Sequence, residues 1–146
     1  MHWESTSSVE SDAPAGAVWD AFLDGRRWSF WNDRFEWMWL EGALARGSFA
    51  TLKLRGSRQT AFVIDDVVPG RRLVLRTTFG PVARVRLILE VEELANGSRI
   101  TYSVIVDGIL RRLAVKMIGR RLADGAPAAL ARLVEYARET KKEEAR

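Results

Sequence analysis

Three residues that could carry chemistry stand among apolar neighbours: Tyr102, Arg121 and Asp66. Tyr102 is the only polar ring in a row of alternating apolar residues. If buried, its hydroxyl would make a structural hydrogen bond, donate to a ligand carbonyl, or act as an acid in a cyclisation or dehydration. Arg121 lies one helical turn after Met117. Because its guanidinium keeps its charge, it must reach solvent, pair with Asp124, or anchor a ligand carboxylate or enolate. Asp66 has the parity of an inward residue, unless the end of its strand twists outward.

An aromatic-rich stretch, residues 29–40, reads SFWNDRFEWMWL. Within it Phe35, Trp37 and Trp39 alternate, as side chains on one face of a β-strand do, and Met38 falls on the other face. We expect the three aromatic side chains to face the interior, where they either fill the core or line a ligand site. If Trp39 faces water instead, the stretch is expected to be a self-association surface, with a homodimer as one outcome.

The composition excludes several kinds of site. The chain has no cysteine, and its only histidine is His2. This excludes disulfides, thiol nucleophiles, thiolate-bound metals, zinc sites with several imidazoles, and catalytic dyads with a core histidine. No cofactor and no metal are expected. The formal net charge is +4, from 23 Lys and Arg against 19 Asp and Glu. Such a balance usually reflects a solvated surface, so no nucleic-acid partner is expected.

The length of 146 residues suits a single domain over residues 1–146. No stretch approaches the roughly 20 apolar residues of a membrane-spanning helix. Residues 1–12 are polar and acidic, which is the reverse of a secretion signal. We therefore expect no membrane span and a cytoplasmic location, with which the lack of cysteine agrees.

Turn signals and periodicity outline the elements that must position these residues. A polar strand is expected at residues 3–10, followed by a helix within SDAPAGAVWDAFLDG, where Pro14 suits the first turn and Gly25 ends the helix. Trp28 and Trp31 follow in a segment expected to pack on the sheet. Turns such as VPGR and the Asn-Gly of LANGSR separate six further strands. These strands are expected at residues 35–40, 48–54, 60–67, 73–79, 83–92 and 100–106.

Alternation in the later strands predicts an antiparallel meander with one buried face and one wet face. The residues expected to face inward are Phe62, Ile64, Leu73, Leu75, Thr77, Val85, Leu87, Leu89, Val91, Ile100, Tyr102, Val104 and Val106. In the strand at 48–54 the parity is open, since Leu52 and Leu54 suggest one inward face and Phe49 the other. The outer face carries arginines that are either solvated or form a surface for an acidic or phosphate-bearing partner. They are Arg76, Arg84 and Arg86.

Residues 110–140 have helical periodicity, interrupted at DGAP, residues 124–127. Pro127 would kink or break the helix there. Each half carries an apolar stripe, and an interruption would bring both stripes onto one curved surface. The first stripe is Leu110, Leu113, Ala114, Met117 and Ile118, and the second is Ala126, Ala129, Leu130, Leu133 and Ala137.

Four segments together resemble the START-like, or SRPBCC, superfamily, and within it the polyketide cyclase/dehydrase and lipid transport group. They are APAGAVWDAFLDGRRWSFWND, VIDDVVPGRRLVLRT, NGSRITYSVIVDG and GRRLADGAPAALARLVEYA. The resemblance implies an α+β helix-grip fold, also described as START/Bet v 1-like. In it a curved seven-stranded antiparallel sheet wraps around a long C-terminal helix. Where members of the family usually have Asn-Pro, this chain has Asn32–Asp33.

The resemblance also implies a cavity between the sheet and the helix. The residues expected to line it are Phe35, Trp37, Trp39, Phe62, Ile64, Leu75, Leu87, Leu89, Tyr102, Val104, Leu113, Met117 and Arg121. The first functional hypothesis is binding or carrying of a small hydrophobic molecule that is lipid-, quinone- or polyketide-like. The second is a cyclase/dehydratase enzyme using the same cavity, which leaves the question of catalysis open. The third is a protein-interaction module using the basic outer face.

Overall fold

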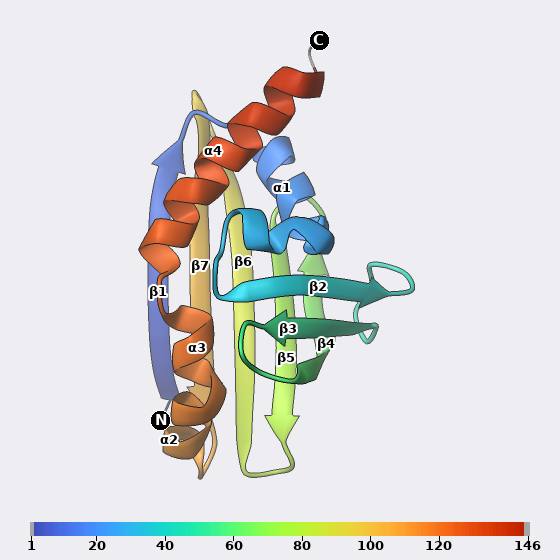
Figure 1. The fold of residues 1–146 in the computed structure, drawn as a ribbon, viewed down its shortest axis with the longest axis vertical. Helices are drawn as coiled ribbons and strands as arrows, with labels where there is room; N and C mark the ends of the chain where they lie inside the picture. Colours follow the sequence, from blue (N-terminus) through green and yellow to red (C-terminus); the bar gives the residue numbers. More distant parts are fainter. Residues whose placement is uncertain (1, 145–146) are drawn as a thin grey trace.

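Seven strands form one antiparallel sheet in the computed structural model, which describes residues 2–144. The strands are β1 (His2–Ser11), β2 (Phe35–Glu41), β3 (Phe49–Leu54), β4 (Gln59–Val68), β5 (Arg72–Phe79), β6 (Ala83–Leu94) and β7 (Gly97–Asp107). Their order across the sheet is β1-β7-β6-β5-β4-β3-β2. The sheet is strongly curved, so that β2 and β3 run across the other strands in Figure 1. This confirms the predicted meander, and β1 pairs with β7 at the edge of the sheet opposite β2.

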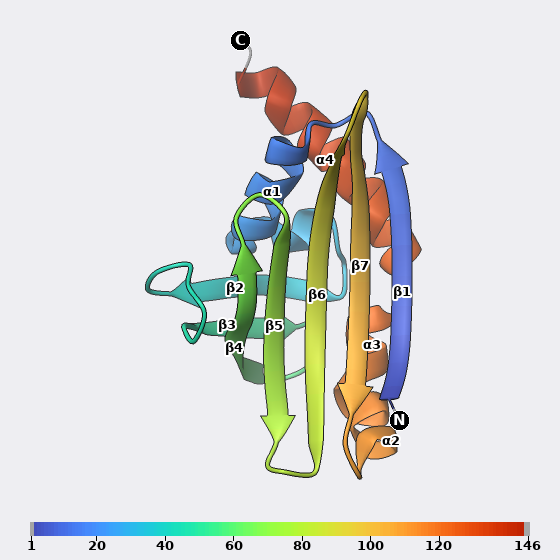
Figure 2. The same ribbon diagram turned by 180° about the vertical axis from the view of Figure 1, so that it is seen from behind.

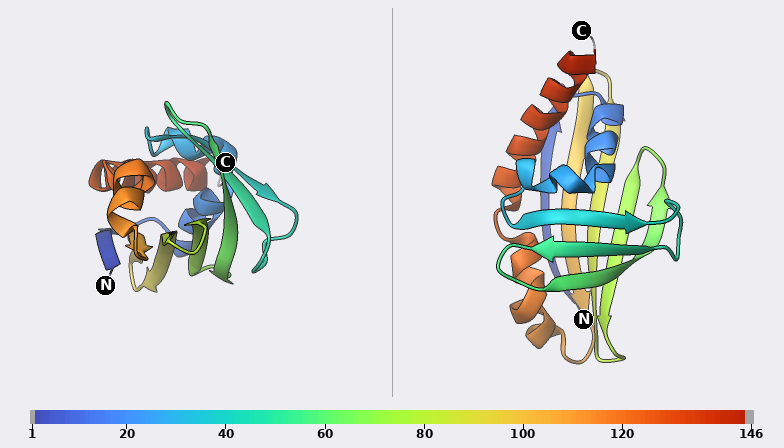
Figure 3. Two further views of the ribbon diagram at one scale, coloured as in Figure 1. Left: turned by 90° about the horizontal axis from the view of Figure 1, so that it is seen from below. Right: turned by 45° about the vertical axis from the view of Figure 1, so that its right-hand side comes forward.

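The described helices all lie on the concave side of this sheet, and none of them covers its other face (Figures 1 and 2). They are α1 (Ala15–Leu23), the 3₁₀ helix η1 (Gly25–Phe30), α2 (Arg111–Ala114), the π-helix η2 (Val115–Gly119), α3 (Arg120–Ala123) and α4 (Ala126–Glu144). Seen from below, the sheet curls around the helical layer (Figure 3). The predicted helix-grip architecture is therefore confirmed.

The alternation predicted for the later strands is confirmed by burial. The apolar residues expected to face inward on β4 to β7 are at most 3% exposed, and Leu52 and Leu54 settle the parity of β3, with Phe49 on the outer face. The second stripe of the C-terminal helical region is likewise buried along α4, which packs against α1 and β1. Burial of these two apolar surfaces against each other supplies the main driving force for the fold.

The C-terminal helical region is fully broken rather than kinked. The amide of Asp124 donates to the Arg120 carbonyl oxygen at 2.7 Å and closes α3. Asp124 itself is extended, with ψ of 135°. Gly125 then turns the chain at φ +77°, a conformation that costs glycine little. Because α4 starts at Ala126, Pro127 falls in its first turn, where a missing N–H is no loss.

The first half of the helical region is rotated from its predicted orientation. Buried positions recur every four residues, at 114–115, 118–119 and 122. That spacing exceeds the roughly 3.6 residues of an α-turn and is accommodated by the π-helix η2. Gly119 faces the sheet, where a Cβ would lie 3.1 Å from Val106 Cγ2. Leu113 and Met117, expected to face the interior, are instead 52% and 54% exposed.

A bulge in β2 reverses the predicted parity of the aromatic stretch. Phe35 pairs with Leu54, but the next paired residue is Trp37, opposite Lys53, so that one residue of β2 has no partner on β3. One extra residue sends all later side chains to the opposite face. Phe35 and Met38 are therefore buried, whereas Trp39 is 46% exposed on the outer face. The expectation that Trp37 and Trp39 face the interior is wrong.

Candidate functional site

The interior between sheet and helices is filled by side chains. Eight residues expected to line a cavity are 0 to 2% exposed, namely Phe35, Phe62, Ile64, Leu75, Leu87, Leu89, Tyr102 and Val104. A side chain lining a void that admits water would keep accessible area in that void. These eight side chains therefore belong to the packed core in this structure, together with Trp28 and Trp31. Any open space for a ligand must lie elsewhere.

Tyr102 has a structural hydrogen bond at the centre of this core. Its hydroxyl donates to the carbonyl oxygen of Leu122, at the point where α3 approaches its end. Burial raises the pKa of the Tyr102 phenol well above its usual range, and the neighbouring Asn32 side chain opposes part of that shift. A phenol so placed holds α3 against β7. It has no access to a ligand in this structure.

Replacing Tyr102 by phenylalanine should lower the free energy of unfolding by about 1–2 kcal/mol, because the Leu122 carbonyl loses its buried donor. The raised pKa adds a dependence on pH. Since the folded state holds the phenolic proton more tightly than the unfolded state, this stabilisation is complete below the unfolded pKa of about 10 and is lost as pH rises above it. Urea unfolding from pH 8 to 11 should therefore show the gap between wild type and Y102F narrowing above about pH 10. A constant gap would contradict this.

One open space among the described residues is a groove at one end of the curved sheet. It lies between the β3–β4 hairpin and β5 on one side and η2 and α3 on the other, with a volume of about 490 Å³. Its lining residues are Leu54, Ser57, Arg58, Gln59, Thr60, Ala61, Thr77, Thr78, Phe79, Met117, Ile118 and Arg121. Met117 and Arg121, two of the predicted site residues, are thus brought together here, whereas Leu113 is not among the lining residues.

The groove combines an apolar part with polar side chains and two cations. Leu54, Phe79, Met117 and Ile118 supply aliphatic and aromatic surface. Arg121 spans the groove, because its Nη1 donates to the Ser57 hydroxyl on the β3–β4 hairpin. Arg121 is exposed, so of the outcomes left open for it, reaching solvent is the one observed. An exposed guanidinium held by a neutral hydroxyl keeps donors available for an anion.

Sequence reasoning missed most of the groove residues. In the sequence the hairpin turn RGSR, residues 55–58, shows only as a break between two strands. Its position opposite the helical region depends on the curvature of the whole sheet. One signal was present, namely the run of polar side chains at Gln59 and Thr60 on a strand whose next inward residue is Phe62. A polar inward end of a strand indicates that the core stops there.

A second hollow lies on the outer face of β2 and β3, where the bulge has placed the indoles. It measures about 440 Å³, and its lining includes Arg26, Trp37, Trp39 and Thr51. The Arg26 guanidinium lies 5.1 Å from the ring centre of Trp39, a cation–π distance. Trp39 faces water, which is the condition under which self-association was expected. Dimer formation through this surface stays a prediction.

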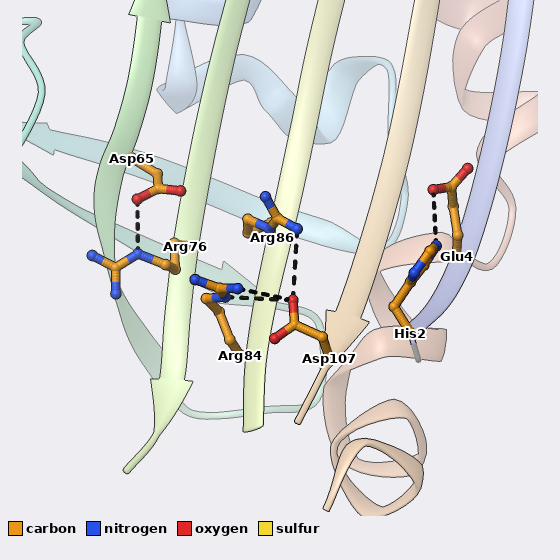
Figure 4. A network of polar contacts seen from close by, with 7 residues as sticks. All are labelled: His2, Glu4, Asp65, Arg76, Arg84, Arg86 and Asp107. Carbon is orange, nitrogen blue, oxygen red and sulfur yellow. Dashed lines mark hydrogen bonds and ion pairs between the residues drawn. The ribbon is translucent and has the colours of Figure 1, made fainter. Parts of the chain in front are cut away.

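The arginines of the outer sheet face are paired with acids. Arg76 Nε lies 2.9 Å from Asp65 Oδ1, and Arg84 and Arg86 approach Asp107 Oδ2 at 3.3 and 3.6 Å (Figure 4). Asp66, after a bulge in β4, also points to this face, where it accepts a hydrogen bond from Arg72 at 2.8 Å. Of the two orientations left open for Asp66, the outward one is observed. Because the charges are locally matched, the face offers little net positive potential to an acidic partner.

The fold and the groove define a helix-grip α+β protein of the SRPBCC, Bet v 1-like class, with an amphipathic groove open at one end of the sheet. A family model described as "Polyketide cyclase / dehydrase and lipid transport" matches residues 2–138. The chain belongs to this family. A search of curated proteins finds no significant match. No helix among the described residues is long and apolar enough to cross a membrane.

Solved structures share the fold at low sequence identity. The di-domain ARO/CYC BexL from the BE-7585A biosynthetic pathway superposes with a TM-score of 0.69 at 18% identity, over 93% of this chain and 50% of that one. This chain thus spans half of BexL. A protein from Nitrosomonas europaea matches with a TM-score of 0.68 at 15% identity, over 95% and 96% of the two chains. A Polyketide_cyc-like protein from Corynebacterium glutamicum has a TM-score of 0.62 at 22% identity, over 98% and 94%.

Proposed function

We propose that the protein binds a small amphipathic molecule in the groove between the β3–β4 hairpin and the η2–α3 helices. The observation that carries this proposal is the juxtaposition of apolar surface with Arg58 and Arg121 in a groove of about 490 Å³. That volume falls within the roughly 300–1,000 Å³ of small-molecule sites. The family description, which includes lipid transport, supports a ligand with a large apolar part.

The two arginines favour a ligand that ends in an acidic or strongly polarised oxygen. A carboxylate or enolate would accept charge-assisted hydrogen bonds from a guanidinium, which are about twice as strong as neutral ones. To admit such a group, Arg121 must exchange its Ser57 hydroxyl for the ligand oxygen. The aliphatic body would then lie against Leu54, Phe79 and Met117. An alkyl or polyketide-like carboxylate has this combination of parts.

Binding is better supported than catalysis at this groove. A cyclase or dehydratase needs a proton donor and acceptor near the reacting carbons. Of the side chains that line the groove, the ionisable ones are Arg58 and Arg121, which do not give up protons near neutral pH. Tyr102, the other candidate acid, is committed to the Leu122 carbonyl inside the core. The enzymatic hypothesis would require a rearrangement that exposes this phenol.

Displacement of 1-anilinonaphthalene-8-sulfonate by decanoate tests the proposal. Both are anions with a large apolar part, and the two should compete for one saturable site. Arg121→Ala should weaken decanoate binding about tenfold or more, since a hydrogen bond to a charged group contributes about 1.5–3 kcal/mol. The matched control is Arg120→Ala, which removes an equal charge from the next residue, outside the groove.

The head-group requirement is checked with a second ligand. Decanol has the same chain without the carboxylate, and its affinity should be weaker than that of decanoate and insensitive to Arg121→Ala. Equal affinity of wild type, R121A and R120A for decanoate would overturn the assignment of Arg121. The absence of any saturable binding would overturn the groove as a ligand site.

A further inference from the structure

An apolar surface remains exposed at the end of the molecule that carries α2. Ile109 and Leu110, in the turn after β7, are 83% and 45% exposed, and Leu113 and Met117 on the adjoining helices are more than half exposed. The Leu110 amide donates to the Val82 carbonyl oxygen at 2.9 Å. The turn between β5 and β6 thus joins the same end, at the bottom of Figures 1 and 2. We call the exposed surface of residues 109–121 the basic pole.

These apolar side chains are exposed because α2 and η2 turn other residues toward the core. Ala114, Val115 and Ile118 occupy the buried side of α2 and η2, so Leu113 and Met117 have no place in the core. Four large apolar side chains are exposed to water along this short segment. Burying them would stabilise the protein by about 25 cal/mol per Å² of apolar surface. Clustering of this kind marks a surface that is covered in the functioning protein.

The positive charge of the chain is concentrated on the same segment. Residues 109–121 contain five basic residues and no acidic one; the basic residues are Arg111, Arg112, Lys116, Arg120 and Arg121. The formal net charge of the whole chain is +4, so the remainder is close to neutral. On the outer sheet face, by contrast, arginines and acids are paired. The basic pole is therefore the place where the protein attracts anions.

We propose that the basic pole docks onto the surface of a membrane rich in anionic phospholipids. Ile109, Leu110 and Leu113 would enter the boundary between head groups and acyl chains, and the surrounding Lys and Arg side chains would contact the phosphates. This is the arrangement of an interfacial amphipathic helix, which lies on a bilayer without crossing it. Each basic residue near an anionic surface adds to the attraction. The proposal stands independently of what the groove binds.

The hollow beside the pole has the chemistry of a phospholipid head-group contact. It measures about 370 Å³ and lies between the start of β1 and the helical region. Its lining includes Trp3, Arg112 and Arg120. Guanidinium groups bind phosphate oxygens with matched geometry, and tryptophan favours the membrane–water interface.

A membrane fits this surface better than a nucleic acid or an acidic protein. Phosphates of a duplex would be met by the cations alone, leaving Ile109 and Leu113 against water or a polar backbone. An acidic protein partner would need its own apolar patch of matching shape. A bilayer supplies both anionic groups and apolar depth over any contour, and Ile109 at a projecting turn suits insertion.

Flotation with lipid vesicles tests the proposal on the full chain. The vesicles are made of phosphatidylcholine alone, or with about one-quarter phosphatidylglycerol to supply anionic charge. Wild type should float with the anionic vesicles and not with the neutral ones, and salt of about 0.5 M should weaken binding. Lys116→Glu with Arg120→Glu, and separately Ile109→Ser with Leu113→Ser, should each weaken binding roughly tenfold or more. All four side chains are exposed, and three of them lie on helices, Ile109 being in the turn before α2. The thermal unfolding temperature of each variant should therefore be nearly unchanged.

Control variants make the same kinds of change, in charge and in apolar surface, at positions outside the pole. Arg46→Glu with Arg71→Glu makes the same charge change at exposed turns elsewhere, and Phe49→Ser removes an exposed apolar side chain from the outer face. Both control proteins should float as wild type does. Equal flotation with neutral vesicles, equal loss in pole and control variants, or binding of duplex DNA without flotation would overturn the proposal. These variants leave the groove residues intact, so loss of docking with unchanged decanoate binding separates the two proposals.

Discussion

Replacing Trp28 by alanine is expected to lower the free energy of unfolding by about 3–5 kcal/mol, the usual cost of truncating a buried aromatic side chain. Trp28 is fully buried. Its ring lies 5.6 Å from that of Trp31 and 5.1 Å from that of Phe35, between centroids. Its indole Nε1 also donates to the Phe22 carbonyl oxygen at 3.1 Å. One side chain thus joins α1, η1 and β2, and its removal leaves a large cavity and an unpaired carbonyl.

Trp39→Ala is the matched control, because it removes the same side chain eleven positions later in the sequence. Trp39 is 46% exposed and its specific contact is the cation–π interaction with Arg26, so the loss should stay near 1 kcal/mol or below. Guanidinium denaturation followed by circular dichroism measures both. If W28A does not fold, Trp28→Phe keeps the aromatic packing and should lose about 1–2 kcal/mol. Equal losses for W28A and W39A would contradict the assignment of core and surface.

Gly25→Ala is expected to cost about 2–3 kcal/mol although it adds a single methyl group. The added Cβ would overlap the backbone carbonyl of Met38, which belongs to the edge strand β2. Backbone cannot move aside as the end of a flexible side chain can. The close approach of η1 to β2 covers the edge of the sheet, which would otherwise present unpaired groups for association. We therefore expect G25A to aggregate on heating in addition to unfolding at lower denaturant concentration.

Gly16→Ala provides the opposite result in the same region. Gly16 is exposed within α1, and a Cβ there would meet no atom within 4 Å. Alanine should therefore stabilise the protein by a few tenths to about 1 kcal/mol, because it has the higher helix propensity. Denaturant midpoints of G16A and G25A should move in opposite directions. A shift of both in the same direction would show that the packing of η1 on β2 is looser than described.

The groove and the basic pole lie at the same end of the molecule. Met117 belongs to both, since it lines the groove and is exposed on η2. If both proposals hold, an amphipathic ligand could pass between a bilayer and the groove without crossing open water. Arg121, which belongs to both the pole and the groove, would meet its acidic end. The two sets of variants change different residues, so either proposal can fail alone.

Most of the fold follows from local patterns in the amino-acid sequence. Strand alternation placed Leu87, Tyr102 and their neighbours inward, because period-two patterning follows directly from strand geometry. The second apolar stripe and the interruption at residues 124–127 were equally local, since they depend on helix periodicity and on the chemistry of glycine and proline. Composition also excluded thiol and multi-histidine sites.

The location of the candidate site, in contrast, depends on contacts between segments that are distant in the sequence. The bulge in β2 turned Trp37 and Trp39 outward, because one unpaired residue depends on how β2 meets β3 and not on the alternation within β2 itself. The π-helix and the close approach of Gly119 to β7 rotated Leu113 and Met117 away from the core. Because these side chains lie outside a filled interior, the open volume is found at the end of the sheet and not, as predicted, between the middle of the sheet and the helix. Periodicity is a property of one segment, whereas a groove is made by several segments meeting, and their meeting is set by long-range packing.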